Sequence, residues 1–113
     1  MKKNFLSKNE QLFKDELLVS NNGKWQAVFQ GDGNFVVYGN GSKPVWASST
    51  NGLDRYRVIM QADGNLVMYN TNNQAVWSTE TGIKEECETC RLVLTDDGKL
   101  ELIQTVTKQV WSS

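Results

Sequence analysis

The sequence contains no histidine, and this absence removes several kinds of chemistry at once. Histidine supplies the general base of Ser-His-Asp triads and is the commonest zinc ligand, so such triads and most zinc sites are excluded. An excess of one charge is missing too, since 12 Lys and Arg stand against 13 Asp and Glu, for a net charge of -1. This balance gives no electrostatic reason to expect nucleic acid or an anionic membrane as a partner.

Long hydrophobic runs are also absent, since no apolar stretch approaches the roughly 20 residues of a membrane span. Residues 1–6 have a basic start with no apolar segment behind it, so they do not read as a secretory signal peptide. Three alternatives follow: the chain is cytosolic, its leader has been removed, or it is exported by another route. With 113 residues, we expect one domain over 1–113 that buries a modest core.

Proline occurs once and cysteine only twice, as Cys87 and Cys90. A Cys-x-x-Cys pair is compatible with a local disulfide, a redox pair or half of a metal site. The metal site lacks two further ligands, and a thioredoxin-like pair would open a helix, whereas no helical period follows. We therefore expect an inert local disulfide or two free thiols in a loop, and no disulfide scaffold.

What the sequence does contain is one nine-residue phrase that occurs twice and returns a third time in altered form. The copies read QGDGNFVVY at 30–38, QADGNLVMY at 61–69 and TDDGKLELI at 95–103. Self-similarity at a fixed period is typical of architectures in which one repeat cannot bury a core alone. We therefore expect three repeats that close around a shared axis. They are centred on 30–46, 61–77 and 95–111.

A tryptophan follows the central glycine of each phrase by 13 positions. These tryptophans are Trp46, Trp77 and Trp111. Because large aromatic side chains dominate small cores, we expect them to fill the axis on which the repeats meet. Trp25 lies outside this set, since Tyr56 and Cys90 occupy the equivalent positions, and the sequence leaves open whether it is core or surface.

Within each phrase, residues alternate with the period of two that is typical of a β-strand. Phe29, Phe35 and Val37 are expected to face the core in the first copy. The opposite face carries residues that the second copy repeats at the same positions. In the first copy they are Gln30, Asp32, Asn34, Val36 and Tyr38, and in the second copy Gln61, Asp63, Asn65, Val67 and Tyr69.

The Asp-Gly-Asn centre of the phrase indicates a hairpin turn between two strands. In the first repeat we expect these strands over 24–29 and 34–38. A further short strand is expected to lead into each tryptophan after a turn-rich segment. These strands are 44–46, 75–77 and 109–111, and the turns before the first two are 39–42 and 70–73. The apolar residues within 10–20 are expected to supply the extra strands that complete the sheets.

The phrase QxDxNxVxY resembles the carbohydrate-binding motif of the bulb-type (monocot, snowdrop-like) mannose-binding lectins. The first and second copies match it at all five positions, and the three-repeat pattern covers nearly the whole chain. The Cys-x-x-Cys-Arg-Leu stretch at 87–92 is most similar to the lily-type lectins of fish skin mucus. The resemblance implies an all-β fold, the type II β-prism, in which three antiparallel four-stranded sheets are arranged with pseudo-threefold symmetry.

The resemblance also implies two sugar sites that need no metal or other cofactor. A carboxylate only accepts hydrogen bonds, whereas a carboxamide donates and accepts, so Asp32 and Asn34 together can satisfy one hydroxyl in both senses. By resemblance this hydroxyl is the axial O2 of mannose, with Gln30 on O3, Tyr38 on O4 and Val36 against the C–H face of the ring. The second copy would act alike through Gln61, Asp63, Asn65, Val67 and Tyr69.

The third copy departs from the motif and keeps only its aspartate. Its residues at the five positions are Thr95, Asp97, Lys99, Glu101 and Ile103. We expect no sugar binding of the family type there. The disulfide that plant members carry across one repeat is not transferred to the adjacent Cys87 and Cys90.

The resemblance implies partners and a setting as well. The partners are mannose and high-mannose glycans on microbial or parasite surfaces, in surface defence and agglutination, without nucleic acid or membrane insertion. Family members commonly dimerise through their C-terminal strands, so a homodimer is expected. Secretion into a mucus-like environment is the expected location, and the cytoplasm is the alternative.

Two other classes of function compete with this interpretation. One is a β-prism that serves as a protein-interaction or bacteriocin-like antimicrobial module with little dependence on sugar. The other is a glycosidase, which would need two carboxylates, and acidic pairs occur at 15–16, 85–86 and 96–97. Adjacent residues of a strand point apart and no pair recurs with the motif, so we expect no enzyme. Calcium is not expected either, since each loop offers one carboxylate where this ion takes several oxygen ligands.

Overall fold

The computed structural model describes residues 3–39, 41–83, 86–104 and 109–113. Over these residues the chain forms short strands joined by turns, and it has no helix that is long and apolar enough to span a membrane. The strands are β1 (Phe5–Ser7), β2 (Gln11–Phe13), β3 (Leu17–Val19), β4 (Gln26–Phe29), β5 (Phe35–Gly39), β6 (Lys43–Ala47), β7 (Arg57–Met60), β8 (Leu66–Tyr69), β9 (Ala75–Ser78), β10 (Arg91–Leu94), β11 (Leu100–Ile103) and β12 (Gln109–Ser112).

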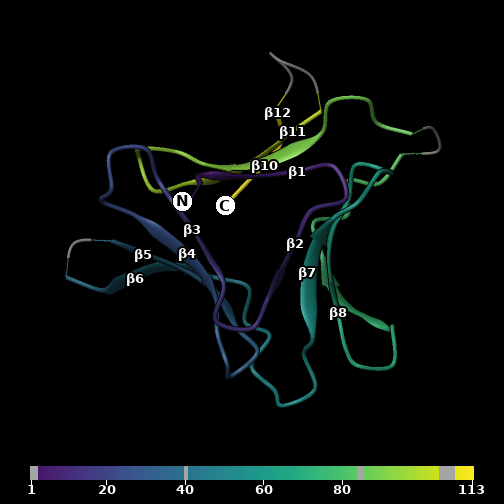
Figure 1. Cartoon of the computed structure of the whole chain (residues 1–113), viewed down its shortest axis with the longest axis horizontal. Helices are drawn as coiled ribbons and strands as arrows, with labels where there is room; N and C mark the ends of the chain where they lie inside the picture. Colours follow the sequence, from purple (N-terminus) through teal and green to yellow (C-terminus); the bar gives the residue numbers. More distant parts are fainter. Residues whose placement is uncertain (1–2, 40, 84–85, 105–108) are drawn as a thin grey trace.

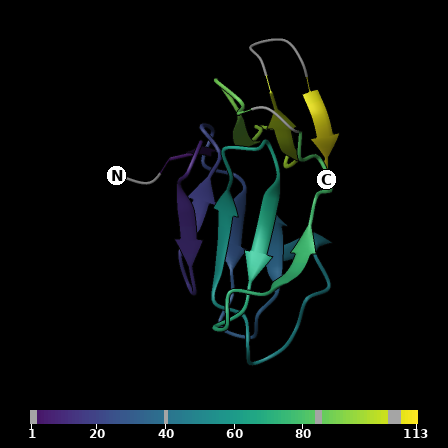
Figure 2. The ribbon, with the colours of Figure 1, turned by 90° about the vertical axis from the view of Figure 1, so that its right-hand side faces the viewer.

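The strands form three antiparallel sheets of four strands each, in the orders β3-β4-β5-β6, β2-β7-β8-β9 and β1-β10-β11-β12. The sheets surround a central axis (Figure 1), and Figure 2 shows the sheet β2-β7-β8-β9 face on. Each sheet takes three strands from one repeat and its fourth from the N-terminal segment. The expected arrangement of three four-stranded sheets is therefore confirmed.

The strand positions agree closely with the sequence pattern. The two strands expected around the first Asp-Gly-Asn turn are β4 and β5, and the strands that lead into the tryptophans are β6, β9 and β12. The segment 10–20 supplies β2 and β3, as expected, but the pattern does not predict β1. This strand has only three residues and forms because it pairs with β10, where Leu6 lies opposite Leu92. Asn40, in the predicted turn 39–42, lies outside the described residues.

The hydrophobic core lies between the inner faces of the three sheets. Phe29, Phe35 and Val37 are completely buried, which confirms their expected inward orientation. The core also contains the middle residue of each N-terminal strand. These residues are Leu6, Leu12 and Leu18. Burying side chains of this size contributes about 1.5–3 kcal/mol each. The N-terminal strands therefore stabilise the prism although each has only three residues.

The three repeated tryptophans meet at the axis, as the spacing predicts. Trp46, Trp77 and Trp111 lie on β6, β9 and β12, and each packs edge to face against the other two. The ring centroids are 5.7 to 6.2 Å apart, within the range preferred by aromatic pairs. Each sheet thus contributes one indole to a shared contact that holds the three sheets together.

Trp25, which the sequence leaves unassigned, joins the first and third repeats. Its Nε1–H donates to the carbonyl oxygen of Asp96 at 2.8 Å. Its ring lies against Gly98, where a Cβ would come within 2.5 Å of the indole. Gly98 also has a φ of +80°, which glycine adopts without strain. Both features require glycine at this position, and Trp25 is a structural residue at the junction of two repeats.

The two cysteines form a local disulfide within the segment that connects β9 to β10. Cys87 and Cys90 are 4% and 2% exposed, so the bond is part of the core although its segment is a loop. Of the alternatives that the sequence leaves open, the structure has the disulfide.

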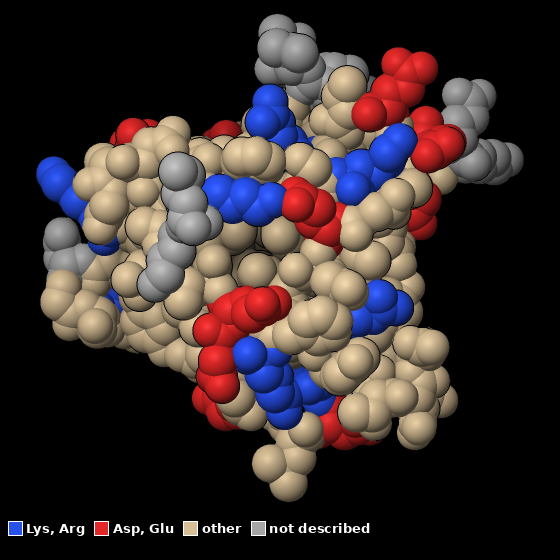
Figure 3. Space-filling view, in the orientation of Figure 1, with Lys and Arg blue, Asp and Glu red and all other residues tan. Residues whose placement is uncertain are grey.

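Charged side chains are mixed on the surface. On the face that Figure 3 shows, Lys and Arg are interspersed with Asp and Glu. No continuous basic area is visible on this face, which agrees with the balanced composition.

Candidate functional site

The first and second phrases form the tips of the β4–β5 and β7–β8 hairpins. In the first tip, the Gln30 N–H donates to the Asn34 carbonyl at 2.9 Å, and the Gly33 N–H donates to the Gln30 carbonyl at 3.0 Å. Gly33 has a φ of +88°, and a Cβ there would lie 2.3 Å from the carbonyl oxygen of Gly52. The second tip has the same bonds and the same backbone conformation at Gly64. The predicted hairpin turn is therefore confirmed twice.

The side chain of the asparagine in each phrase is oriented by hydrogen bonds to its Oδ1 atom. Oδ1 of Asn34 accepts from the hydroxyl of Ser48 at 3.2 Å and from the N–H of Thr50 at 3.3 Å. The Asn34 N–H itself donates to Oδ1 of Asp32 at 3.0 Å, as in an Asx turn. This arrangement occupies Oδ1 of the asparagine and leaves its Nδ2 hydrogens to donate to another molecule. The neighbouring aspartate keeps Oδ2 as an acceptor.

The second phrase repeats this arrangement with different hydroxyl donors. Oδ1 of Asn65 accepts from the hydroxyl of Thr79 at 3.0 Å and from the N–H of Thr81 at 3.3 Å. The Asn65 N–H donates to Oδ1 of Asp63 at 3.0 Å. Two tips on different sheets therefore present the same donor beside the same acceptor.

The glutamine and tyrosine of each phrase contact one another. In the second phrase, Nε2 of Gln61 donates to the hydroxyl of Tyr69. In the first, the carboxamide of Gln30 satisfies both neighbours when its nitrogen faces Asp32, with Nε2 3.1 Å from Oδ1 and 3.2 Å from Oδ2. Its oxygen then accepts from the hydroxyl of Tyr38. The structure thus brings glutamine, aspartate, asparagine and tyrosine together in both phrases, on one face of each hairpin.

The valine of each phrase is less accessible than the sequence suggests. Val36 and Val67 lie on the same face as the polar residues but are only 3% exposed. Val36 is in an inner strand, where Val28 and Ala47 flank it in register. Packing against a sugar ring therefore stays a prediction, and it involves only a small part of each valine side chain.

Sequence reasoning missed the hydroxyl residues that orient the asparagines. Thr50 also donates through Oγ1 to the Gly33 carbonyl at 2.7 Å, and Thr81 donates likewise to Gly64 at 2.7 Å. A signal for them exists, because Ser-x-Thr and Thr-x-Thr begin two residues after Trp46 and Trp77. The repeat therefore continues past the tryptophans in the first two copies.

Known proteins share both this sequence and this fold. No protein-family model matches the chain. The B-type lectin plumieribetin of Scorpaena plumieri is 54% identical over 110 residues, which cover 97% of this chain and 94% of that protein. The chain belongs to the bulb-type (B-type) lectin family. Family membership confirms the resemblance drawn from the repeated phrases. Lectins bind sugars without transforming them, so it also confirms that the protein is not an enzyme.

Two solved structures of this family are similar over most of their length. The Polygonatum cyrtonema lectin, complexed with monomannoside, is 38% identical with a TM-score of 0.80, covering 96% of this chain and 93% of that one. The snowdrop (Galanthus nivalis) agglutinin, complexed with methyl-α-D-mannoside, is 35% identical with a TM-score of 0.79, covering 91% of each chain. These likenesses confirm the type II β-prism for this lectin.

The third phrase keeps the turn of this lectin but not its polar face. The hydroxyl of Thr95 accepts from the N–H groups of Asp97 and Lys99 at 3.3 and 3.2 Å, replacing the aspartate as the acceptor within the turn. Lys99 stands where the other phrases have asparagine, and its side chain is exposed. Glu101 and Ile103 stand where the other phrases have valine and tyrosine. The absence of family-type binding at this tip stays a prediction.

One carboxylate in each of two acidic pairs accepts a backbone hydrogen bond. Oε1 of Glu16 accepts from the Phe13 N–H at 2.7 Å, and Oδ1 of Asp96 accepts from the Asn22 N–H at 2.9 Å. Glu85 of the third pair lies outside the described residues. Within the described ranges, no group of three or more Cys, Asp or Glu side chains could hold a metal ion.

Two carboxyl groups away from both phrases have a lowered pKa. The hydrogen bond from Lys3, followed by that from the Ser7 N–H, lowers the pKa of Glu10. The hydroxyl and N–H of Thr71 lower the pKa of Asp54. Both groups accept hydrogen bonds within connections between strands, which is a structural role.

Replacing Thr50 with valine tests the network that orients Asn34. Valine removes the hydroxyl that the buried Gly33 carbonyl needs, and an unpaired buried acceptor costs about 1–3 kcal/mol. We expect the free energy of unfolding, measured by urea denaturation, to fall by that amount and sugar affinity to fall at the first site only. Thr81→Val is the reciprocal control at the second site. Equal affinity losses at both sites in either variant would contradict this.

Proposed function

We propose that this lectin binds mannose and high-mannose glycans through two metal-independent sites, one on each complete phrase. The observation that carries the proposal is the duplicated geometry, in which an asparagine donor and an aspartate acceptor are fixed side by side on two different sheets. Packing does not require this duplication, because the third phrase folds into the same turn without the asparagine.

The chemistry of the two groups suits a sugar hydroxyl. A hydroxyl donates one hydrogen bond and accepts others, so it can accept from Nδ2 of the asparagine while donating to Oδ2 of the aspartate. By family resemblance this is the axial O2 of mannose. Glucose carries O2 equatorially and would leave these groups unpaired, which is a strong basis for discrimination. The mannoside complexes of the snowdrop and Polygonatum relatives support the assignment.

Affinity at one such site is expected to be low. Shallow sites of this kind have a Kd on the order of 1 mM, or about -4 kcal/mol. Useful binding then requires that several sites engage one branched glycan or one cell surface. Two sites in each chain provide this, and a homodimer would double them. Secretion and a role in agglutination or surface defence belong to the same proposal.

A glycan array with and without free mannose tests the proposal, followed by calorimetric titration with methyl α-mannoside. We expect binding to high-mannose glycans that free mannose competes and glucose does not. A stoichiometry of two per chain is expected, and a chelator should change neither quantity because the protein supplies every ligand atom. Glycan binding that free mannose does not compete would contradict the mannose assignment. Microbial killing that mannose cannot compete would favour the sugar-independent antimicrobial module instead.

A further inference from the structure

The two sites present the same polar groups but are supported by different neighbours. At the first site, the loop that follows β6 supports the tip. The Gly52 N–H donates to the Asp32 carbonyl at 2.8 Å, and Nε of Arg55 donates to the Thr50 carbonyl at 3.0 Å. Arg55 also lies against Gly33, where a Cβ would be 2.6 Å from its Cγ.

At the second site, the loop that follows β9 gives the matching backbone contact, since the Ile83 N–H donates to the Asp63 carbonyl at 2.8 Å. Further support there comes from distant parts of the chain. The Thr81 carbonyl accepts from Nε2 of Gln104 at 3.2 Å, and Gln104 directly follows β11. The disulfide lies behind the tip, since a Cβ on Gly64 would be 3.5 Å from Sγ of Cys90. The Cys87 N–H donates to the Ala62 carbonyl at 2.7 Å. Gln104 therefore replaces Arg55, and the disulfide segment adds a contact that the first site lacks.

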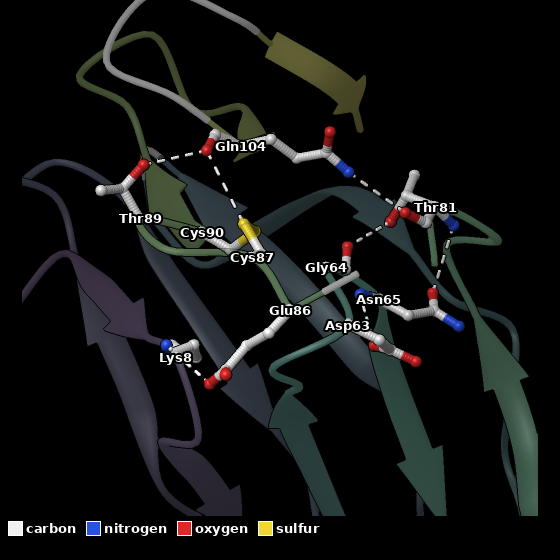
Figure 4. The surroundings of a disulfide bond; sticks show 10 residues. All are labelled: Lys8, Asp63, Gly64, Asn65, Thr81, Glu86, Cys87, Thr89, Cys90 and Gln104. Carbon is white, nitrogen blue, oxygen red and sulfur yellow. Dashed lines mark hydrogen bonds and ion pairs between the residues drawn. A yellow bond between two sulfur atoms is a disulfide. The ribbon is translucent and has the colours of Figure 1, made fainter. Parts of the chain in front are cut away.

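The disulfide segment also positions Gln104 itself. The carbonyl oxygen of Gln104 accepts from the hydroxyl of Thr89 at 2.9 Å and lies 3.7 Å from Sγ of Cys87. Figure 4 shows these contacts in sequence, from the disulfide through Gln104 to Thr81 and on to Asn65. A continuous set of contacts thus connects the disulfide to the asparagine of the second site, and the first site has no part in it.

We infer that the Cys87–Cys90 disulfide is a positioning element of the second site, and that its redox state sets sugar affinity there while leaving the first site unchanged. The inference rests on the proposed function, because it concerns the strength of the same binding. Its consequence is a change of valency. The oxidised lectin has two sites of full strength per chain, whereas the reduced lectin has one, so reduction halves the number of strong sites and lowers avidity.

The reduction step needs an external dithiol. Its thiolate attacks one sulfur of the disulfide, and the mixed disulfide is then resolved by the second thiol of the reagent. Two electrons and two protons pass to the protein, giving two cysteine thiols and the cyclic disulfide of the reagent. Because Cys87 and Cys90 are 4% and 2% exposed, attack requires the segment to open. Without the disulfide, the backbone of residues 87–90 is no longer constrained by a covalent cross-link. The hydrogen bond from Thr89 then no longer fixes the position of Gln104.

Site-resolved NMR titration with methyl α-mannoside tests the inference on the ¹⁵N-labelled whole chain. The side-chain amides of Asn34 and Asn65 report the two sites separately. After reduction with dithiothreitol, we expect affinity at Asn65 to fall about tenfold, a size typical of coupling through packed contacts. Affinity at Asn34 should change less than about twofold. Reoxidation should restore the second site. Equal affinity at Asn65 before and after reduction, or equal losses at both sites, would overturn the inference.

Variants separate positioning from general loosening of the fold. Gln104→Ala should weaken the second site with the disulfide intact, and Arg55→Ala should weaken only the first. The pair Cys87→Ala and Cys90→Ala should reproduce reduction without reagent, with an unchanged circular dichroism spectrum. If this pair failed to fold, reduction and Gln104→Ala would still decide the question.

Hydrogen exchange separates this inference from the proposed function. Reduction should speed exchange of the Thr81 amide, which donates to Asn65, and leave the Thr50 amide unchanged. If neither site of the oxidised protein bound mannoside, the proposed function would fail while this difference still supported the positioning role. Unchanged exchange at Thr81 would refute the positioning role whatever the sugar result.

Discussion

Replacing Asn34 and Asn65 together with aspartate is expected to abolish mannoside binding without unfolding the lectin. Aspartate has the size and shape of asparagine, and its Oδ1 can still accept from the residues that hold Asn34 and Asn65. Its second oxygen, however, accepts where Nδ2 donates, and it brings another negative charge beside Asp32 or Asp63. A ligand hydroxyl would then face acceptors only.

The expected loss is large relative to the binding energy available. An unpaired polar contact costs about 1–3 kcal/mol, more when a charge is involved, whereas one site supplies only about -4 kcal/mol. Calorimetry should therefore detect no binding to the double variant. Each single variant should retain one site, with a stoichiometry of one per chain. Binding by the double variant at the strength of the unmodified lectin would disprove the assignment of both sites. Asn34→Ala with Asn65→Ala gives the same test without added charge.

The fold could be predicted well because its determinants are local and repeated. The alternation at 30–38 places Phe35 and Val37 in the core, and the spacing from glycine to tryptophan places three indoles on one axis. Both are properties of short segments that recur, and the recurrence separates them from a chance pattern. β1 escaped prediction for the opposite reason, since its pairing with β10 joins residues that are far apart in the sequence.

The site could be predicted only in part. The polar residues of each phrase are visible because they alternate within a few positions. The groups that orient them are not, since Thr50 and Gln104 reach their partners across turns and between sheets. The burial of Val36 likewise depends on strands to either side. Sequence periodicity shows which face a side chain occupies, whereas its accessibility and orientation depend on neighbours brought by the fold.

The largest effect on stability is expected from Trp77→Ala, which removes one of the three indoles on the axis. Trp77 packs edge to face against Trp46 and Trp111, at centroid distances of 6.1 and 6.2 Å. Trp77 is half-buried and packs against the core, so its truncation should cost about 3 kcal/mol, the lower end of the range for core aromatics. This is still a large share of the roughly 5–15 kcal/mol that stabilises a small domain. Urea denaturation followed by far-UV circular dichroism measures the loss without relying on the altered tryptophan signal.

Matched variants show whether the loss comes from the axis. Trp77→Phe keeps an aromatic edge for both neighbours, so it should cost clearly less than alanine. Tyr56→Ala removes an aromatic ring that is 46% exposed and away from the axis, where it packs edge to face on Phe13 alone. Losing one such pair costs about 0.5–1.5 kcal/mol, well below the loss expected for Trp77→Ala. The tryptophans should also behave as a unit, because each contacts both others. Trp46→Ala combined with Trp77→Ala should therefore cost less than the sum of the two single losses. Additive losses would mean that each indole stabilises only its own sheet, and that the shared contact does not hold the three sheets together.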